Sequence, residues 1–132
     1  MTKQISLFLE NRPGRIAKVA KTLGINNINM KAFSMTETPD FGIMRIVVSD
    51  LERAVVVLNE ANFAVSLTDV VCIQSPDRPG SLSTVLESLA AADIDINYMY
   101  AFSEGDLAQF VIKPSDIEKC EQVLSNSGCV IL

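Results

Sequence analysis

Histidine is missing from the 132 residues of this chain. Because histidine is the commonest general base near neutral pH and the commonest zinc ligand, its absence removes the usual basis for both kinds of site. The sequence also shows no nucleophile placed beside a base, so an enzyme is the least supported class of function. We therefore expect no catalytic residues, no metal site and no cofactor.

Cysteine is scarce, and its placement argues against disulfides. Cys72, Cys120 and Cys129 form no Cys-x-x-Cys pair, and each lies in an apolar periodic segment. We interpret them as buried free thiols, whose odd number suits a reducing cytoplasm. Apolar runs long enough to span a membrane are missing too, and the first five residues begin a strand-like alternation without a signal-peptide pattern. These features predict a cytoplasmic chain with no membrane partner.

Basic residues are too few to suggest a nucleic-acid partner. The chain has 11 Lys and Arg against 16 Asp and Glu, a net charge of -5, whereas phosphate binding needs a basic surplus. The basic residues that crowd together are Arg12, Arg15, Lys18 and Lys21. Their spacing favours a solvated helix face over a phosphate-binding track. With 48% hydrophobic residues the chain is globular, and its length allows one ordinary domain or two very small ones.

An internal duplication accounts for the whole length. Asn11-Arg12-Pro13-Gly14 recurs 66 residues later as Asp77-Arg78-Pro79-Gly80, and twice this offset is the length of the chain. The same offset pairs Ser49-Asp50-Leu51-Glu52 with Ser115-Asp116-Ile117-Glu118 without a gap. A gapless register along both halves predicts two domains, residues 1–66 and residues 67–132.

Each copy shows the same alternation of strand and helix patterns. In the first copy the predicted order is strand 5–9, helix 13–23, strands 30–36 and 43–48, helix 49–58 and strand 63–65. The second copy gives strand 71–73, helix 79–89, strands 96–102 and 108–113, helix 115–124 and strand 129–131. Proline suits the first turn of the first helix in each copy, and Asn26, Asn27 and Asp93 end those helices.

Capping boxes open the second helix of each copy. Ser49 with Glu52, and Ser115 with Glu118, have the required spacing. Helix capping also explains all the carboxylates of these segments, which are Asp50, Glu52, Asp116 and Glu118. They therefore do not indicate a metal site.

The order βαββαβ, repeated twice, predicts an α+β, ferredoxin-like fold. Each copy should form a four-stranded antiparallel sheet with both helices on one face and the strand order 4-1-3-2. Such a small domain is marginal alone, and its second strand leaves an open edge. We therefore expect the two copies to pair side by side, strand two against strand two, into one eight-stranded antiparallel sheet with helices on one face.

The loop from the first strand into the first helix is the most informative segment for binding. A helix start offers unpaired backbone N–H groups and the positive end of a dipole. Gly14 and Gly80 carry no side chain that would keep a carboxylate away from such an end. A purely structural interpretation also fits: Asn11 or Asp77 caps the helix, proline starts it and glycine eases the turn.

Asn-Arg-Pro-Gly-x-Ile, followed by Asn-Ile-Asn-Met, resembles the signature of the ACT family of regulatory amino-acid-binding domains. Asp-Arg-Pro-Gly-Ser-Leu and Asp-Ile-Asp-Ile-Asn give the second copy the same resemblance, which thus covers nearly the whole chain. It implies a non-catalytic module that holds a free amino acid between the loop of one domain and the start of strand two of its neighbour. Carried over by position, the ligand-binding residues are Asn11, Arg12, Pro13, Gly14, Arg15, Ile16, Asn29, Met30, Asp77, Arg78, Pro79, Gly80, Ser81, Leu82, Asp95 and Ile96.

The two copies differ within this set. Asn11 and Asn29 correspond to Asp77 and Asp95 in the second copy. A carboxylate can pair with a ligand ammonium, whereas an amide can donate to a ligand carboxylate. The two sites should therefore not be equivalent, and one of them can be vacant.

Three kinds of partner follow from these considerations. They are a free amino acid, a separate enzyme of amino-acid metabolism, and a second copy of the chain packed sheet on sheet. The last is indicated by the second strand of each copy, an edge strand with apolar residues on both faces: Tyr98, Tyr100 and Phe102 with Met99 between them, and Phe33 and Met35 in the first copy. The alternative function is that of a non-catalytic regulatory subunit that acts by protein–protein contact and keeps only vestigial ligand sites.

Overall fold

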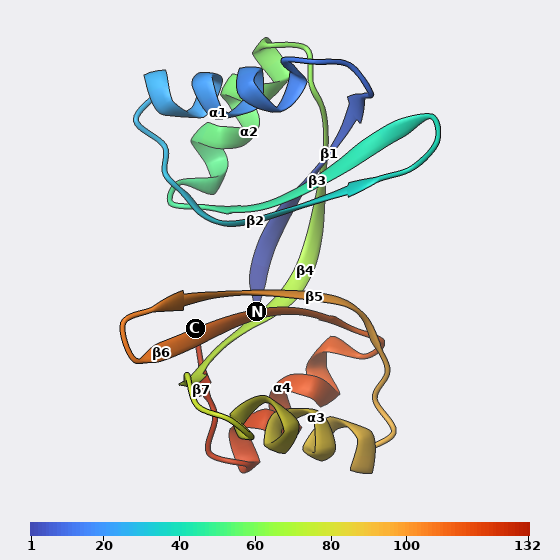
Figure 1. Cartoon of the computed structure of the whole chain (residues 1–132), viewed down its shortest axis with the longest axis vertical. Coiled ribbons are helices and arrows are strands. Elements are labelled where there is room, and N and C mark those ends of the chain that lie inside the picture. Colours follow the sequence, from blue (N-terminus) through green and yellow to red (C-terminus); the bar gives the residue numbers. More distant parts are fainter. The chain divides into compact units, whose positions relative to one another are not determined.

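In the computed structural model of the chain, all 132 backbone positions are described, together with every side chain except that of Glu104. Two compact units result, and each is described by itself. The first copy is Lys3–Thr68, and the second copy is Asp69–Leu132 with Met1–Thr2. The elements, shown in Figure 1, are β1 Thr2–Glu10, α1 Arg15–Ile25, β2 Met30–Glu37, β3 Phe41–Val48, α2 Leu51–Glu60, β4 Ala64–Pro76, α3 Ser81–Ala91, β5 Ile96–Glu104, β6 Leu107–Pro114, α4 Ile117–Asn126 and β7 Val130–Ile131.

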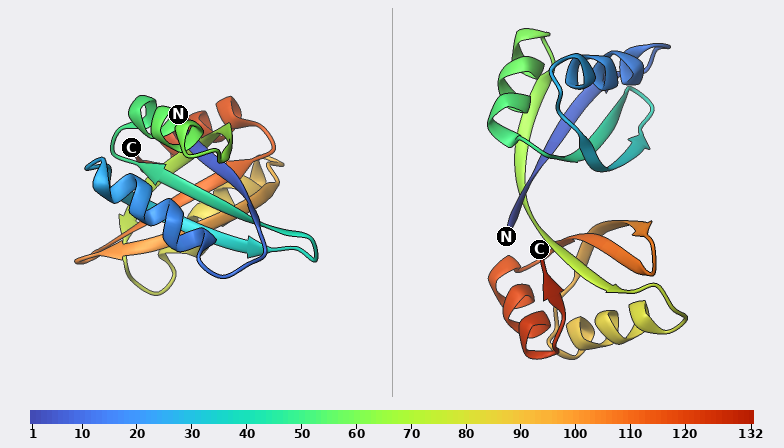
Figure 2. Two further views of the ribbon diagram at one scale, coloured as in Figure 1. Left: turned by 90° about the horizontal axis from the view of Figure 1, so that it is seen from above. Right: turned by 90° about the vertical axis from the view of Figure 1, so that its left-hand side faces the viewer.

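The predicted βαββαβ order and strand order are confirmed in both copies. In the first copy the strands run β2-β3-β1-β4, and in the second β7 and β6 flank β4, with β5 beyond β6. The second strand of each copy, β2 or β5, therefore lies at an edge and pairs with one strand, β3 or β6. Figure 2 shows from two further sides that both helices of each copy lie on one face of its strands.

The expected eight-stranded sheet is wrong. The described chain forms seven strands, because the last strand of the first copy and the first strand of the second are one element, β4. No glycine or proline interrupts residues 64–75, and Val65, Thr68 and Val70 are β-branched. With nothing in the sequence to turn the chain, the extended conformation continues across the border between the two units.

Left-handed residues end the helices at equivalent positions, as the sequence predicts for the first helix of each copy. Asn27 and Asp93 both have φ of 58°, and Asn62 and Gly128 follow the second helices with φ of 66° and 79°. Asparagine, aspartate and glycine adopt this conformation more readily than other residues do. At these four turns the chain leaves a helix and continues into the next strand of the sheet.

Each copy has its own hydrophobic core between helices and sheet. The buried members in the first copy are Ile5, Leu7, Leu9, Val19, Leu23, Ile28, Met44, Ile46, Ala54, Leu58 and Phe63. Those in the second are Val71, Ile73, Val85, Leu89, Ile94, Ala108, Phe110, Ile112, Cys120 and Leu124. Strand residues enter these sets at every second position and helix residues at every third or fourth, as amphipathic elements require.

The second helices are capped one residue later than the capping boxes predict. Asp50 is the cap of α2 and accepts from the backbone N–H of Arg53 at 3.2 Å. Asp116 caps α4 in the same way and accepts from Lys119 N–H at 3.0 Å. Ser49 is occupied elsewhere, since its hydroxyl accepts from the backbone N–H of Asn29 at 3.0 Å. The serine thus joins the helix entry to the start of β2.

Of the described helices, none combines the length and the apolar character that crossing a membrane requires.

Candidate ligand-binding site

A tight turn shapes the loop between the first strand and the first helix of each copy. Gly14 and Gly80 both have φ of 89°, and each is the cap residue before its helix. In the second copy Ser81 N–H donates to the Arg78 carbonyl at 3.1 Å, which closes a turn of the Pro-Gly type II kind. Pro13 and Pro79 therefore precede the helices instead of starting them, because the turn places a left-handed glycine between proline and helix.

The start of each of these helices has no side-chain cap. The first hydrogen bond within α1 runs from Lys18 N–H to the Gly14 carbonyl at 2.9 Å. The backbone N–H groups of residues 15–17 therefore have no acceptor within the helix. The expectation that Asn11 or Asp77 caps the helix is wrong. Asn11 Nδ2 instead donates to the Thr38 carbonyl at 2.9 Å, and Asp77 Oδ2 accepts from Ser103 Oγ at 3.0 Å. The first-turn amides are left for solvent or an anion.

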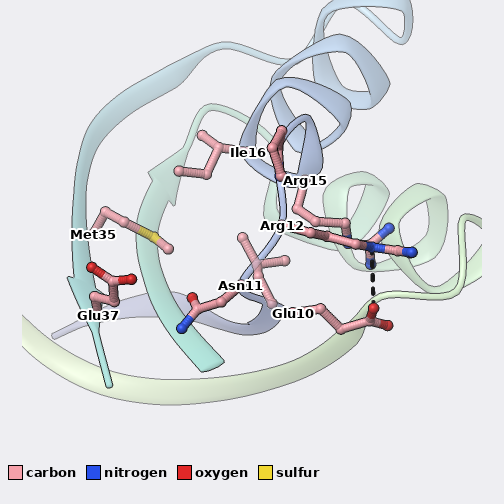
Figure 3. A pocket seen from close by; sticks show the side chains of 9 residues that line it. Glu10, Asn11, Arg12, Arg15, Ile16, Met35 and Glu37 are labelled. Carbon is pink, nitrogen blue, oxygen red and sulfur yellow. Dashed lines mark ion pairs between the residues drawn. The ribbon is translucent and has the colours of Figure 1, made fainter. Parts of the chain in front are cut away.

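A pocket of about 390 Å³ lies beside this loop in the first copy. In Figure 3, Met35 and Glu37 of β2 lie on one side of it, and Arg15 and Ile16 lie on the other. Leu9, which is 1% exposed, also lines the pocket. The full lining is Leu9, Glu10, Asn11, Arg12, Pro13, Arg15, Ile16, Met35 and Glu37.

The four charged residues of this pocket are not equivalent. Arg12 Nε pairs with Glu10 Oε2 at 3.1 Å, so these two neutralise one another. The Arg15 guanidinium lies 4.8 Å from the ring centroid of Phe63, a cation–π contact, while its Nε is buried without a hydrogen-bond partner. Among the described side chains, neither Arg15 nor Glu37 takes part in an ion pair. The pocket therefore presents one unpaired cation and one unpaired anion.

The second copy has a smaller pocket at the equivalent place. Its volume is about 280 Å³, and a shallower hollow of about 420 Å³ shares Arg78 and Ser81 with it. The pocket is lined by Pro76, Asp77, Arg78, Ser81, Leu82, Ala101, Phe102, Ser103, Ala108 and Phe110. The hollow is lined by Arg78, Pro79, Gly80, Ser81 and Thr84.

Most predicted loop residues come together at these pockets. Asn11, Arg12, Pro13, Arg15 and Ile16 line the first, while Gly14 opens the helix beside it without lining it. In the second copy all six predicted loop residues, 77–82, line the pocket or the hollow.

The strand-two residues of the prediction lie elsewhere in their own copies. The backbone N–H of Asn29 donates to the Ser49 hydroxyl, and its carbonyl accepts from the backbone N–H of Ser49. Asp95 makes the same two bonds with Ser115, and both pairs lie at the far end of β2 and β5 from the loop. Met30 packs against the first core, and Ile96 occupies the equivalent place in the second. None of the four lines a described pocket. Their contribution to a site shared by the two copies stays a prediction.

The residues at the end of the second strand were not predicted from the sequence. Met35 and Glu37 in the first copy, and Ala101, Phe102 and Ser103 in the second, complete the pockets. The signal was available in the predicted topology. Two successive antiparallel pairings, strand one with three and three with two, bring the end of strand two to the end of strand one, where the loop begins.

The free thiols are confirmed, with one difference in burial. Cys72 and Cys120 are buried, and Cys129 is half-buried. Burial, together with nearby Glu121 and Asp116, raises the pKa of Cys120 from 9.0 to about 11, and burial also raises the pKa of Cys129. Within the described residues, His, Cys, Asp and Glu form no group of three or more that would hold a metal ion.

The family model described as an ACT domain pair matches residues 1–129. The chain belongs to the ACT domain family. The resemblance inferred from the two Arg-Pro-Gly loops is thereby confirmed, and the loops lie where this ACT pair has its pockets.

Solved structures share the fold of the ACT pair. Protein BT0572 from Bacteroides thetaiotaomicron is 44% identical with a TM-score of 0.95, over 99% of this chain and 91% of that one. The regulatory subunits of aspartate kinase from Thermus thermophilus, in ligand-free form, and Thermus flavus are each 16% identical, with TM-scores of 0.71 and 0.68. The alignments cover 94% and 93% of this chain and 90% and 88% of theirs. A search of curated proteins gave no match.

Proposed function

We propose that this ACT pair is a non-catalytic regulatory protein that binds a free amino acid at the loop before α1. The observation that carries the proposal is the uncapped start of α1 beside a pocket with an unpaired arginine, Arg15. Backbone amides at a helix start and a guanidinium are both strong partners for a carboxylate. The fold shared with regulatory subunits of aspartate kinase supports a regulatory role.

The regulated enzyme, on this proposal, is a separate chain of amino-acid metabolism in the cytoplasm. A second copy of the chain packs against the sheet face opposite the helices. Tyr98, Tyr100 and Phe102 lie on that face, because they pair with Lys113, Val111 and Gln109, which alternate with the core residues of β6. Sedimentation at several concentrations tests this contact, and a monomer at all of them contradicts it.

A thermal-shift screen against the twenty amino acids, followed by calorimetry on the hits, tests the proposed function. A ligand that binds only the folded chain and is present at 100 times its Kd stabilises it by about 2.7 kcal/mol. We expect a subset of amino acids to raise the Tm in this way. A flat response to all twenty contradicts ligand binding.

A second candidate is a regulatory subunit with vestigial sites that acts by protein–protein contact. The second copy favours it, because Ser103 already donates to Asp77, the acidic loop residue of that pocket. On this alternative no amino acid binds, and variants at Arg15 leave the effect on the partner enzyme unchanged.

A separate test addresses the predicted contribution of Asn29 and Asp95, at the start of the second strand of each copy, to ligand binding. Asn29→Ala and Asp95→Ala should weaken ligand binding if these residues reach the loop of the other copy. Unchanged Kd in both variants, with the stability retained, restricts the site to the loop and the end of strand two.

A further inference from the structure

The two pockets occupy equivalent places but differ in a concerted way. At the offset of 66 residues, Arg15 corresponds to Ser81 and Glu37 to Ser103. All four line the pocket of their copy. The unpaired cation and the unpaired anion of the first copy are therefore both replaced by serine in the second. The second pocket keeps one cation, Arg78, and one anion, Asp77, but the Asp77 carboxylate already accepts from Ser103 Oγ at 3.0 Å.

The two charges of the first pocket lie on opposite sides. Figure 3 shows Glu37 on the β2 side and Arg15 on the helix side, with Asn11 between them. The remaining charged pair, Glu10 with Arg12, is closed by its own contact of 3.1 Å. A ligand that carries one negative and one positive group matches the two charges that remain, while a further charge on the ligand would find no partner.

The apolar part of the pocket differs in concert too. A Cβ built on Gly42 would fall on the Met35 methyl group, so Met35 occupies this place only because residue 42 has no side chain. The equivalents of Met35 and Gly42 are Ala101 and Ala108. Where the second copy has the fixed methyl group of Ala108, the first copy has the end of the flexible Met35 side chain. A thioether of this kind adapts to an apolar ligand group.

We infer that the first copy alone binds, and that its ligand is a zwitterionic α-amino acid with a large uncharged side chain. This inference rests on the proposed function. The ligand carboxylate binds Arg15 and the first-turn amides of α1, and the ammonium binds Glu37. The side chain packs on Leu9, Ile16 and Met35, of which the last two are 44% and 39% exposed and available for contact.

Calorimetry on the full chain tests the ligand class directly. L-Leucine, L-methionine and L-phenylalanine are the expected ligands, and glycine, L-aspartate and L-lysine are the comparison set. We expect one site per chain and at least tenfold weaker binding for the comparison set. Leucinamide, which lacks the carboxylate, and N-acetyl-leucine, which lacks the ammonium, should each bind at least tenfold more weakly than leucine.

Variants that convert the first pocket toward the second test the residues. Arg15→Ser and Glu37→Ser should each weaken leucine binding at least tenfold. Lys21→Ser is the matched control from α1, because Lys21 is exposed and does not line the pocket, and it should change the Kd less than threefold. Arg78→Ser should leave the Kd and the stoichiometry unchanged. Urea midpoints within error of the parent show that the variants still fold.

The apolar prediction has an independent pair of variants. Gly42→Ala should displace the Met35 side chain and change the ranking of leucine, methionine and phenylalanine, while Gly42→Ala with Met35→Ala recreates the arrangement of the second copy. Two sites per chain, preference for a charged side chain, or unchanged binding in Arg15→Ser and Glu37→Ser overturns the inference and leaves amino-acid binding in place. If no amino acid binds, the proposed function fails, and this inference fails with it.

Discussion

Asn11 of the first loop donates from Nδ2 to the carbonyl oxygen of Thr38 at 2.9 Å, which ties the loop to the turn between β2 and β3. Asp77 makes the corresponding connection in the second copy, but as an acceptor from Ser103 Oγ at 3.0 Å. Both connections use the residue that the purely structural interpretation of the loop makes a helix cap. The loop is therefore positioned by the hairpin beside it.

Replacing Asn11 by alanine should loosen this connection without unfolding the copy. The lost bond is exposed, so we expect a cost of about 0.5–1 kcal/mol in the free energy of unfolding, measured by urea denaturation. Hydrogen exchange should accelerate at the turn between β2 and β3 more than in α2. Asn11→Asp, which puts a carboxylate against the Thr38 carbonyl, should cost at least as much. If it restores the parent's stability, the donor role of Asn11 is contradicted.

Gly14→Ala should destabilise the chain by about 1 kcal/mol, because the residue has φ of 89° and an L side chain is strained there. Nothing lies within 4 Å of a Cβ at this position, so the cost comes from the backbone alone. Gly24→Ala is the matched control: it lies inside α1, also with open space around its Cβ, and should stabilise by about 0.5–1 kcal/mol. Opposite signs in urea denaturation are expected, and equal signs contradict the assigned conformation.

The aspartate caps of α2 and α4 should contribute equally. Asp50→Ala and Asp116→Ala each remove a side-chain acceptor for a first-turn amide, at a cost of about 1 kcal/mol. Because the two caps share no partner, the double variant should lose the sum. Chemical denaturation of the four proteins measures this.

The raised pKa of Cys120 predicts a loss of stability at alkaline pH. The folded chain holds this thiol proton up to a pKa of about 11, whereas the unfolded chain releases it near the ordinary value of 9.0. Between these values the unfolded state binds fewer protons, so the free energy of unfolding falls as the pH rises. Cys120→Ala should show a shallower fall than the parent from pH 9 to 11. Parallel curves for the two proteins contradict the assigned burial effect.

The sequence was sufficient for the elements that depend on local pattern. Asn27 and Asp93 end their helices as expected, because a left-handed residue is a local requirement. The cap of α2 was misplaced by one residue, since Ser49 and Asp50 are both good caps and only the tertiary bond from Asn29 to Ser49 decides between them.

Two features were harder to predict: the border between the copies, and the residues at the end of the second strand that line the pockets. Where the duplication suggested two strands, β4 is continuous, because repetition in the sequence does not require a turn in the backbone. Glu37 was overlooked, since it lies 27 residues from Glu10 along the chain and only the pairing of three strands brings the two to one pocket.

The Met35 methyl group occupies the space where a side chain of residue 42 would begin, and this affects how the two copies can have diverged from a common ancestor. Two single substitutions separate Met35 with Gly42 from the alanines at 101 and 108. The route through alanine at 42 first places a methyl group against the end of the flexible Met35 side chain, which must move aside. The route through alanine at 35 first leaves only a vacancy at a half-exposed position. For a gene duplicated from one ancestral domain, the structural effect of a mutation at 42 therefore depends on whether residue 35 is still methionine.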